Sequence, residues 1–206
     1  ADYFLDKYIV GYFHPMDIII GYNHHFGHKR HGDSEYLNKM KEQYNYNLYI
    51  KEPIKINDVP VSSSQIRSYL KESNLEAANR FLGREYEFSG KIVEGDGRGQ
   101  LMNIPTANIV LKNVNQLIPA KGVYCVDANV DNHNYSGMCN IGVRPTFYED
   151  GESVIEVHLI TDDKLSLYGK EIQIKFKEFI REEKKYDSAE DLANQLMQDR
   201  YNCQLN

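Results

Sequence analysis

The sequence predicts an α+β protein in two parts, a parallel α/β segment followed by an antiparallel β segment that ends in a helix. Up to about residue 82 the chain alternates between strand-like and helix-like periodicity, which is typical of a parallel sheet. From about Tyr86 the apolar residues recur at every second position between turn residues. Short strands in succession favour an antiparallel barrel or sandwich.

The first part is predicted to contain two strands and two helical regions. The expected elements are strands over 16–23 and 46–52 and helical regions over 34–44 and 62–83. The last of these is expected to be interrupted near Ser73 and Asn74 and to end at Gly83. Two strands make a thin sheet, so further strands are expected before Ala1.

The second part is predicted to be mostly strands. The strand candidates are residues 87–95, 122–130, 134–142, 154–160 and 170–180. A helix follows, with Ser188 as its N-cap and with Leu192 and Leu196 on one face. The change of pattern near Gly83 predicts two domains, residues 1–83 and 84–206.

The composition of the chain argues against several classes of binding partner. The net charge is −6 and the pI is near 5.7, whereas nucleic-acid-binding proteins usually carry a basic face. No apolar run approaches the roughly 20 residues of a membrane span. The three cysteines, Cys125, Cys139 and Cys203, are odd in number, far apart and without a CxxC motif. We therefore expect no nucleic acid, no membrane, no disulfide framework or zinc site, and a cytoplasmic location.

Residues 95–108, GDGRGQLMNIPTAN, combine a flexible loop with a stiff corner. Glycines let backbone N–H groups approach a phosphate closely, and an arginine adds a matching donor fork. The residues of this type are Gly95, Gly97, Arg98 and Gly99. Thr106 and Asn108 supply a hydroxyl and an amide oxygen, which Mg²⁺ accepts beside waters and substrate phosphates. The alternative is a glycine-rich hairpin followed by a polar strand.

The segment VIEVHLI, residues 154–160, places Glu156 and His158 on one face of a strand and apolar residues on the other. A carboxylate held on a strand could act as general base toward a substrate hydroxyl. The alternative is that both side chains lie on the solvated face of the sheet.

Six motifs in this order resemble the riboflavin kinase domain of the bacterial bifunctional riboflavin kinase/FAD synthetases, from Tyr86 to about Asp199. They are GDGRGQLMNIPTANI, GVY, IGVRPTF, VIEVHLI, LYGKEIQIKF and FIREEKKYDSAEDL. The first 82 residues are similar to the end of the family's adenylyltransferase domain, through IIIGYNHHFG, HGD and SSSQIR. The resemblance implies a six-stranded antiparallel barrel with a C-terminal helix, preceded by a partial Rossmann-like nucleotidyltransferase domain.

The same resemblance implies phosphoryl transfer from ATP to riboflavin, giving FMN and ADP, with Mg²⁺ as cofactor. Glu156 would be the general base, and Thr106 and Asn108 would hold the metal. The residues implied to contact ATP are Gly95, Gly97, Arg98, Gly99, Thr106 and Tyr168. Those implied to border the flavin are Arg181, Lys184 and Tyr186.

Gln100, Leu101 and Asn103 depart from the family pattern, which often has basic residues and a glycine there. Less positive charge near the phosphates would weaken ATP binding. These departures leave open the alternative of a flavin-binding barrel without kinase activity. A separate alternative is an FMN adenylyltransferase whose missing segment is supplied in trans.

Two motifs in the first part concern adenylyl transfer. HFGH, from His25 to His28, matches the H-x-G-H signature of nucleotidyltransferases, but it follows a later strand than that signature does in the family. We expect it not to be the catalytic motif. In SSSQIR, the residues Ser63, Ser64 and Arg67 are implied to form a phosphate site at a helix start, and the alternative is a capped helix with a solvated arginine.

Overall fold

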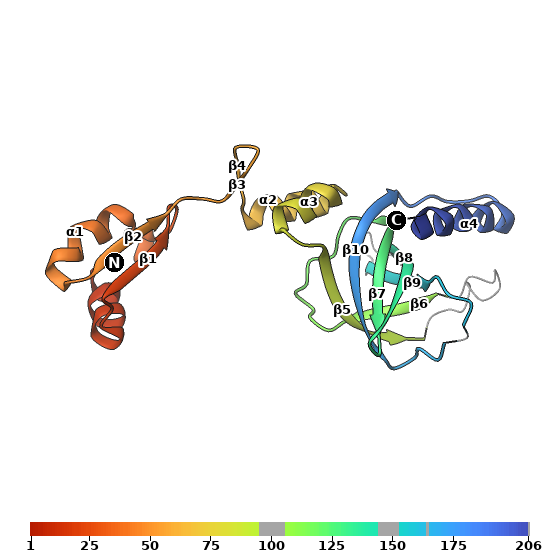
Figure 1. Ribbon diagram of the computed structural model, residues 1–206, viewed down its shortest axis with the longest axis horizontal. Coiled ribbons are helices and arrows are strands. Elements are labelled where there is room, and N and C mark those ends of the chain that lie inside the picture. Colours follow the sequence, from red (N-terminus) through yellow and green to blue (C-terminus); the bar gives the residue numbers. More distant parts are fainter. Residues whose placement is uncertain (95–105, 144–152, 164, 206) are drawn as a thin grey trace. The chain divides into compact units, whose positions relative to one another are not determined.

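The computed structural model describes residues 1–94, 106–143, 153–163 and 165–205. Contacts divide the chain into two compact units, residues 1–61 and 62–206 (Figure 1). Each unit has its own cluster of buried apolar side chains.

The first unit is a small parallel α/β structure. Its elements are the π-helix η1 (Phe4–Phe13), β1 (Asp17–Gly21), the 3-10 turn η2 (His28–Arg30), α1 (Ser34–Tyr44), β2 (Asn47–Lys51), and a hairpin of β3 (Lys55–Ile56) and β4 (Val59–Pro60). Strands β1 and β2 pair in parallel, as the alternating pattern predicts. The fully buried core is small and consists of Leu5, Ile20, Leu37 and Tyr46.

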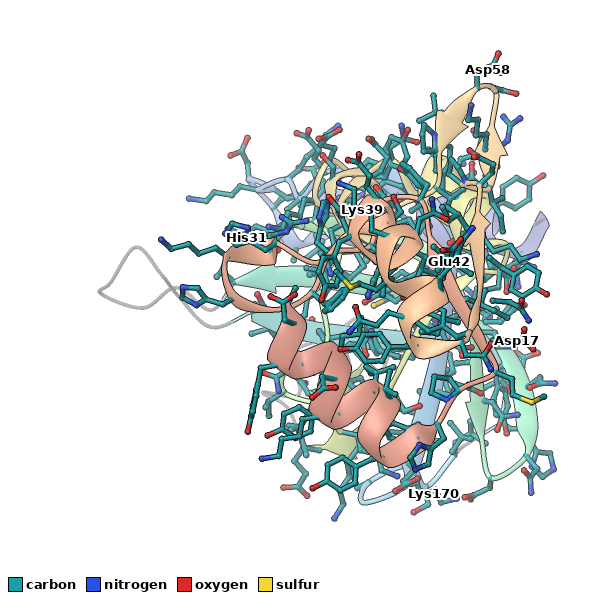
Figure 2. All side chains as sticks on the ribbon, turned by 90° about the vertical axis from the view of Figure 1, so that its left-hand side faces the viewer. Asp17, His31, Lys39, Glu42, Asp58 and Lys170 are labelled. Atoms are coloured by element: carbon teal, nitrogen blue, oxygen red, sulfur yellow. A yellow bond between two sulfur atoms is a disulfide. The ribbon has the colours of Figure 1, made fainter. Side chains whose placement is uncertain are left out.

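Helix α1 begins where the sequence places a cap. The Asp33 carboxylate accepts a hydrogen bond from the Tyr36 amide at 2.8 Å, so one of the orphan donors of the first turn is satisfied. The outer face carries Lys39 and Glu42, which point away from the unit (Figure 2). The helix is therefore amphipathic, with Leu37 buried beneath it.

The second unit is built on a closed six-stranded antiparallel barrel, as the resemblance implies. Its strands are β5 (Tyr86–Val93), β6 (Ala107–Leu111), β7 (Gly122–Val130), β8 (His133–Val143), β9 (Ser153–Leu159) and β10 (Glu171–Arg181). They close in the order β10-β5-β6-β9-β8-β7. Periodicity alone did not indicate β6, because this strand is only five residues long.

Helices α2 (Ser63–Lys71) and α3 (Leu75–Leu82) belong to the barrel unit, so packing divides the chain earlier than the predicted boundary at residues 83 and 84. Leu70, Leu75 and Ala78 are buried in the barrel's own cluster. Asn79 ties α3 to two strands: its amide donates to the Phe176 carbonyl at 2.9 Å and accepts from the Tyr86 amide at 2.7 Å. The apolar stripe of a helix predicts that one face of the helix is buried, but it does not predict which unit covers that face.

The predicted break between the two helices, the predicted helix end at Gly83 and the predicted N-cap at Ser188 are confirmed. Ser73 has a φ of 60° between α2 and α3, and the Asn74 side chain caps α3 by accepting from the Ala77 amide at 3.2 Å. Gly83 ends α3 with a φ of 70°, a conformation that glycine adopts without strain. Ser188 caps the last helix, α4 (Ala189–Leu205), by accepting from the Asp191 amide at 3.0 Å.

Cys125 of β7 and Cys203 of α4 form a disulfide, which corrects the expectation of no disulfide. The two residues are 78 positions apart, and their Cα atoms lie 5.1 Å from each other. They are close because α4 lies on the outer face of the barrel over Cys125 and Met138, with Ile160, Ile180 and Leu196 packed around them. Cysteine spacing cannot show which helix covers which strand. The third cysteine, Cys139, is free and buried.

Candidate functional site

Each side chain of the barrel strands points either into the core of the barrel or to its outer face. Ile155, Val157 and Leu159 of β9 point into the core of the barrel. Side chains alternate along a strand, so Glu156 and His158 lie on the outer face. This face is not simply solvated, since His158 is only 5% exposed and Asn108 on the neighbouring strand is 7% exposed.

Glu156 lies between two amide side chains. It pairs in register with Asn108 of β6 on one side and with Asn140 of β8 on the other. Directly opposite residues of antiparallel strands share a face and have Cβ atoms about 5 Å apart. A partly buried carboxylate is thus flanked by two neutral amides. Asn140 was missed by sequence reasoning, because its place in this row depends on strand register.

The row continues around the barrel toward β10. Asn140 pairs with Val123 of β7, and Val123 pairs with Arg181 of β10. Arg181 therefore belongs to the same cross-strand row as Glu156, three strands away. We call Asn108, Glu156, Asn140, Val123 and Arg181 the site row.

A pocket of about 190 Å³ adjoins the site row, with walls from β6, β9, the segment between β9 and β10, and α4. Its walls include Thr106, His158 and Tyr168, two of which were predicted to contact the nucleotide. Thr106 directly precedes β6, and His158 lies on the paired strand β9. The remaining lining residues, which sequence reasoning missed, are Ala107, Leu159, Thr161, Asp163, Leu165, Leu167 and Arg200.

The three residues implied to border the flavin occupy different environments. The Arg181 side chain is largely buried and forms an ion pair with Asp199 of α4 at 2.7 Å. Tyr186 is partly buried, with its ring centroid 5.9 Å from the Arg181 guanidinium carbon. Lys184 is exposed. The structure thus brings Arg181 and Tyr186 together and leaves Lys184 in solvent.

Several predicted residues lie elsewhere. Gly95, Gly97, Arg98 and Gly99 fall outside the described residues, as do Gln100, Leu101 and Asn103. Ser63, Ser64 and Arg67 are exposed on the first turns of α2, where the Ser62 hydroxyl accepts from the Gln65 amide at 3.2 Å. His25 and His28 are exposed on the segment after β1, and the neighbouring His31 is exposed as well (Figure 2).

The electrostatics of the barrel disfavour Cys139 as a reactive group. Burial raises the pKa of the Cys139 thiol, and the neighbouring Glu156 carboxylate adds to the rise. Cys139 therefore stays protonated at neutral pH, and it faces the core of the barrel. A thiol of this kind is a poor nucleophile.

The chemistry of the donor set fits a hard divalent cation. Thr106 directly precedes β6 and offers a hydroxyl, and Asn108, two positions further along, offers an amide oxygen beside the Glu156 with which it pairs. Mg²⁺ prefers oxygen ligands and keeps several waters or phosphate oxygens. In the part of the chain that the structure describes, no group of three His, Cys, Asp or Glu side chains could hold a metal. Neutral oxygen ligands and substrate phosphates would have to complete such a site.

The fold and site together define a closed antiparallel barrel protein with a carboxylate beside neutral oxygen donors. The riboflavin kinase family model matches residues 82–205, and a model of FAD synthetase matches residues 1–65. The chain belongs to the riboflavin kinase family.

Curated relatives cover almost all of this chain. The bifunctional riboflavin kinase/FMN adenylyltransferase of Buchnera aphidicola is 35% identical over 95% of it, and that of Bacillus subtilis is 34% identical over 96%. The chain spans 62% of the length of each of these relatives.

A crystal structure described as a macrolide-efflux protein from Streptococcus pneumoniae has a TM-score of 0.86 and 30% identity to this chain. It covers 98% of this chain, which corresponds to 64% of that protein. Within the described ranges of the present chain, every helix is too short or too polar to span a bilayer.

Proposed function

We propose that residues 84–206 carry a riboflavin kinase, which transfers the γ-phosphate of ATP to the 5′-hydroxyl of riboflavin and gives FMN and ADP. The observation that carries this proposal is the register that puts Glu156 directly beside Asn108, with Thr106 and Tyr168 at the adjoining pocket. Family membership and the names of the curated relatives support the same substrates.

In the proposed reaction, Glu156 accepts the proton of the riboflavin 5′-hydroxyl as that oxygen bonds to the γ-phosphorus. The bond between the γ-phosphorus and the bridging oxygen breaks, and ADP leaves with its electron pair. Phosphoryl transfer needs little covalent help from the protein, so alignment and charge neutralisation contribute most of the rate. Mg²⁺, held by Thr106 and Asn108, would supply neutralisation of the phosphate charge.

Tyr168 and His158 have a positioning role in this proposal. His158 is a buried wall of the pocket, and Tyr168, which is 52% exposed, lies at its edge. A pocket with aromatic and apolar walls excludes water from a transferring phosphate while it holds the nucleotide. We propose that ATP enters here and that its phosphates lie over Thr106.

Incubation of the chain with riboflavin, ATP and Mg²⁺, followed by mass spectrometry of the flavin, tests the function. Conversion to FMN is the expected result. Riboflavin that binds but stays unchanged would support the alternative of a flavin-binding barrel without kinase activity. A control with the γ-phosphate replaced by a non-transferable analogue should yield no FMN.

The metal proposal predicts a steep change in Mg²⁺ dependence. Thr106→Val and Asn108→Leu remove an oxygen ligand each while keeping the approximate shape of the side chain. The Mg²⁺ concentration for half-maximal rate should rise sharply in both variants, with partial rescue at saturating Mg²⁺. Titration of the initial rate with MgCl₂ at fixed ATP measures this. Wild-type Mg²⁺ dependence in both variants would remove these residues from the metal site.

We propose that this chain alone does not form FAD from FMN. Adenylyl transfer needs donors fixed around the α-phosphate and a pocket that aligns FMN. Ser63, Ser64 and Arg67 are exposed on the first turns of α2, and His25 and His28 are exposed on the segment after β1, so none of these side chains is buried around a ligand. Mass spectrometry after incubation with FMN and MgATP should find no FAD. FAD formation that His28→Ala abolishes would contradict this proposal.

We also propose a cytoplasmic location. It rests on the low cysteine content, with three cysteines in 206 residues. The Cys125–Cys203 disulfide runs against that argument, because disulfides are rare in reducing compartments. Alkylation of thiols during cell lysis, followed by mass spectrometry, would report the state of the pair in cells. Reduced thiols would support the cytoplasm, and a fully formed disulfide would count against it.

A further inference from the structure

The C-terminal helix reaches the candidate flavin site through one buried carboxylate. Asp199 of α4 is 0% exposed. Its two oxygens accept from the Arg181 Nε at 3.2 and 3.0 Å, and one of them accepts from Nη2 at 2.7 Å. The Gln195 amide, one turn earlier on the same helix, donates to the other oxygen at 2.9 Å. The carboxylate is therefore held from two sides.

This ion pair fixes the plane of the Arg181 guanidinium. Nη1 donates to the Glu182 carbonyl at 3.1 Å, so these contacts use three of the five N–H donors that a guanidinium carries. Two-point contact between a guanidinium and a carboxylate gives geometric specificity as well as energy. Removing two charges from water offsets much of the gain in stability, so a buried pair is weak evidence for a purely stabilising role.

The guanidinium that Asp199 orients lies in the site row. Arg181 pairs with Val123, and the row continues through Asn140 to Glu156. Three strand spacings separate the two charged residues, which is about 14 Å along the sheet. A single hydrogen bond cannot span that separation, but an elongated ligand can. Such a ligand would have a hydroxyl at one end and hydrogen-bond acceptors at the other.

The Arg181 end of the row offers donors to such acceptors. The guanidinium has two further N–H groups beyond those used by Asp199 and Glu182. The Tyr186 hydroxyl is buried and has no hydrogen-bond partner among the residues that the structure describes. Its ring centroid lies 5.9 Å from the guanidinium carbon. A buried hydroxyl without a partner is costly, and a ligand acceptor would satisfy it.

We infer that Asp199 is a positioning residue for riboflavin, an inference that rests on the proposed function. Its carboxylate holds the Arg181 guanidinium so that the remaining N–H groups meet the carbonyl and ring-nitrogen acceptors of the flavin. Flavin affinity then depends on the contact between Asp199 and Arg181. The nucleotide pocket takes Arg200 from α4, but neither Asp199 nor Arg181 lines it.

Because the disulfide holds α4 on the barrel, the effect of Asp199 on riboflavin binding can be measured without loss of the helix from its place. Cys203 lies four residues after Asp199 on α4 and links it covalently to β7. Loss of the Asp199 charge should therefore leave the helix in place. Asp199→Asn keeps the size of the side chain but removes the charge that pairs with Arg181, and Asp131→Asn is the matched control. Asp131 is exposed and its carboxylate lies 2.7 Å from the Lys170 ammonium, and neither residue lines the nucleotide pocket or belongs to the site row.

The experiment measures riboflavin affinity by fluorescence quenching, together with KM for riboflavin and for ATP. Asp199→Asn should raise the Kd and KM for riboflavin by about tenfold or more, as expected for losing hydrogen bonds to a charged group. KM for ATP should change less than about twofold. Arg181→Lys, which keeps the charge but not the two-point contact, should have a similar effect. The double variant should be no weaker than either single variant, because the two residues act as one unit. Asp131→Asn should match the wild type.

Three results would overturn the inference. The first is unchanged riboflavin affinity in both Asp199→Asn and Arg181→Lys. The second is an equal rise of both KM values together with a lower melting temperature, which would mark a structural role. The third is a double variant whose loss is the sum of the single losses. A wild-type chain that neither binds nor phosphorylates riboflavin would instead refute the proposed function, and this inference with it.

Discussion

Glu156→Gln is expected to lower kcat for FMN formation by about 10²–10⁴-fold, the usual loss when a positioned acid–base group is removed. The amide keeps the size of the side chain and its place between Asn108 and Asn140, but it cannot accept the proton of the riboflavin hydroxyl. Riboflavin and ATP should still bind. Steady-state kinetics with a separate riboflavin titration measure the two effects.

The matched control for that variant is Glu178→Gln. Glu178 lies on β10 and pairs with Cys125, outside the site row, so the same chemical change there should leave kcat near the wild-type value. Near-full turnover in Glu156→Gln would return Glu156 to the alternative of a solvated surface carboxylate. Weaker binding with an unchanged kcat would make it a binding residue and not a base.

Loss of the Cys125–Cys203 disulfide is expected to lower the free energy of unfolding by about 2–4 kcal/mol. The bond closes a long loop, since the two cysteines are 78 positions apart, so it removes considerable conformational freedom from the unfolded chain. It also holds α4 against the apolar cluster around Met138 and Leu196. Urea unfolding of the barrel unit with and without reductant, followed by circular dichroism, measures the difference.

Cys203→Ser is the control for that comparison. The variant should resemble the reduced wild type, and reductant should not lower its stability further. Cys139 is free and buried, so its reaction with thiol reagents reports unfolding of the oxidised wild type. Equal stability of oxidised and reduced wild type, with the disulfide verified by mass, would contradict the prediction.

The sequence indicated those features of the site that depend on local pattern. Alternation in VIEVHLI separated Glu156 and His158 from the apolar face, and the structure bears out that separation. The cap at Ser188 and the break at Ser73 were also readable, because caps and turns depend on neighbouring residues.

Features that depend on register or on long-range packing could not be predicted. Asn140 belongs to the site row only because β8 pairs with β9 in one register, and a shift of one residue would turn it to the core. Asp199 has the sequence context of an ordinary helix surface, yet α4 docks with this residue inward. The disulfide has the same origin, since it requires α4 to lie over β7.

The most direct test of the account is a crystal structure of the chain with riboflavin, ADP and Mg²⁺. The 5′-hydroxyl oxygen of riboflavin should lie within about 2.6–3.2 Å of a Glu156 carboxylate oxygen, as required of a general base. The phosphates should lie at Thr106 and the flavin ring at Arg181. Riboflavin bound with its hydroxyl away from Glu156, for example in the polar hollow lined by Asp127, Gln173 and Lys175, would contradict the account.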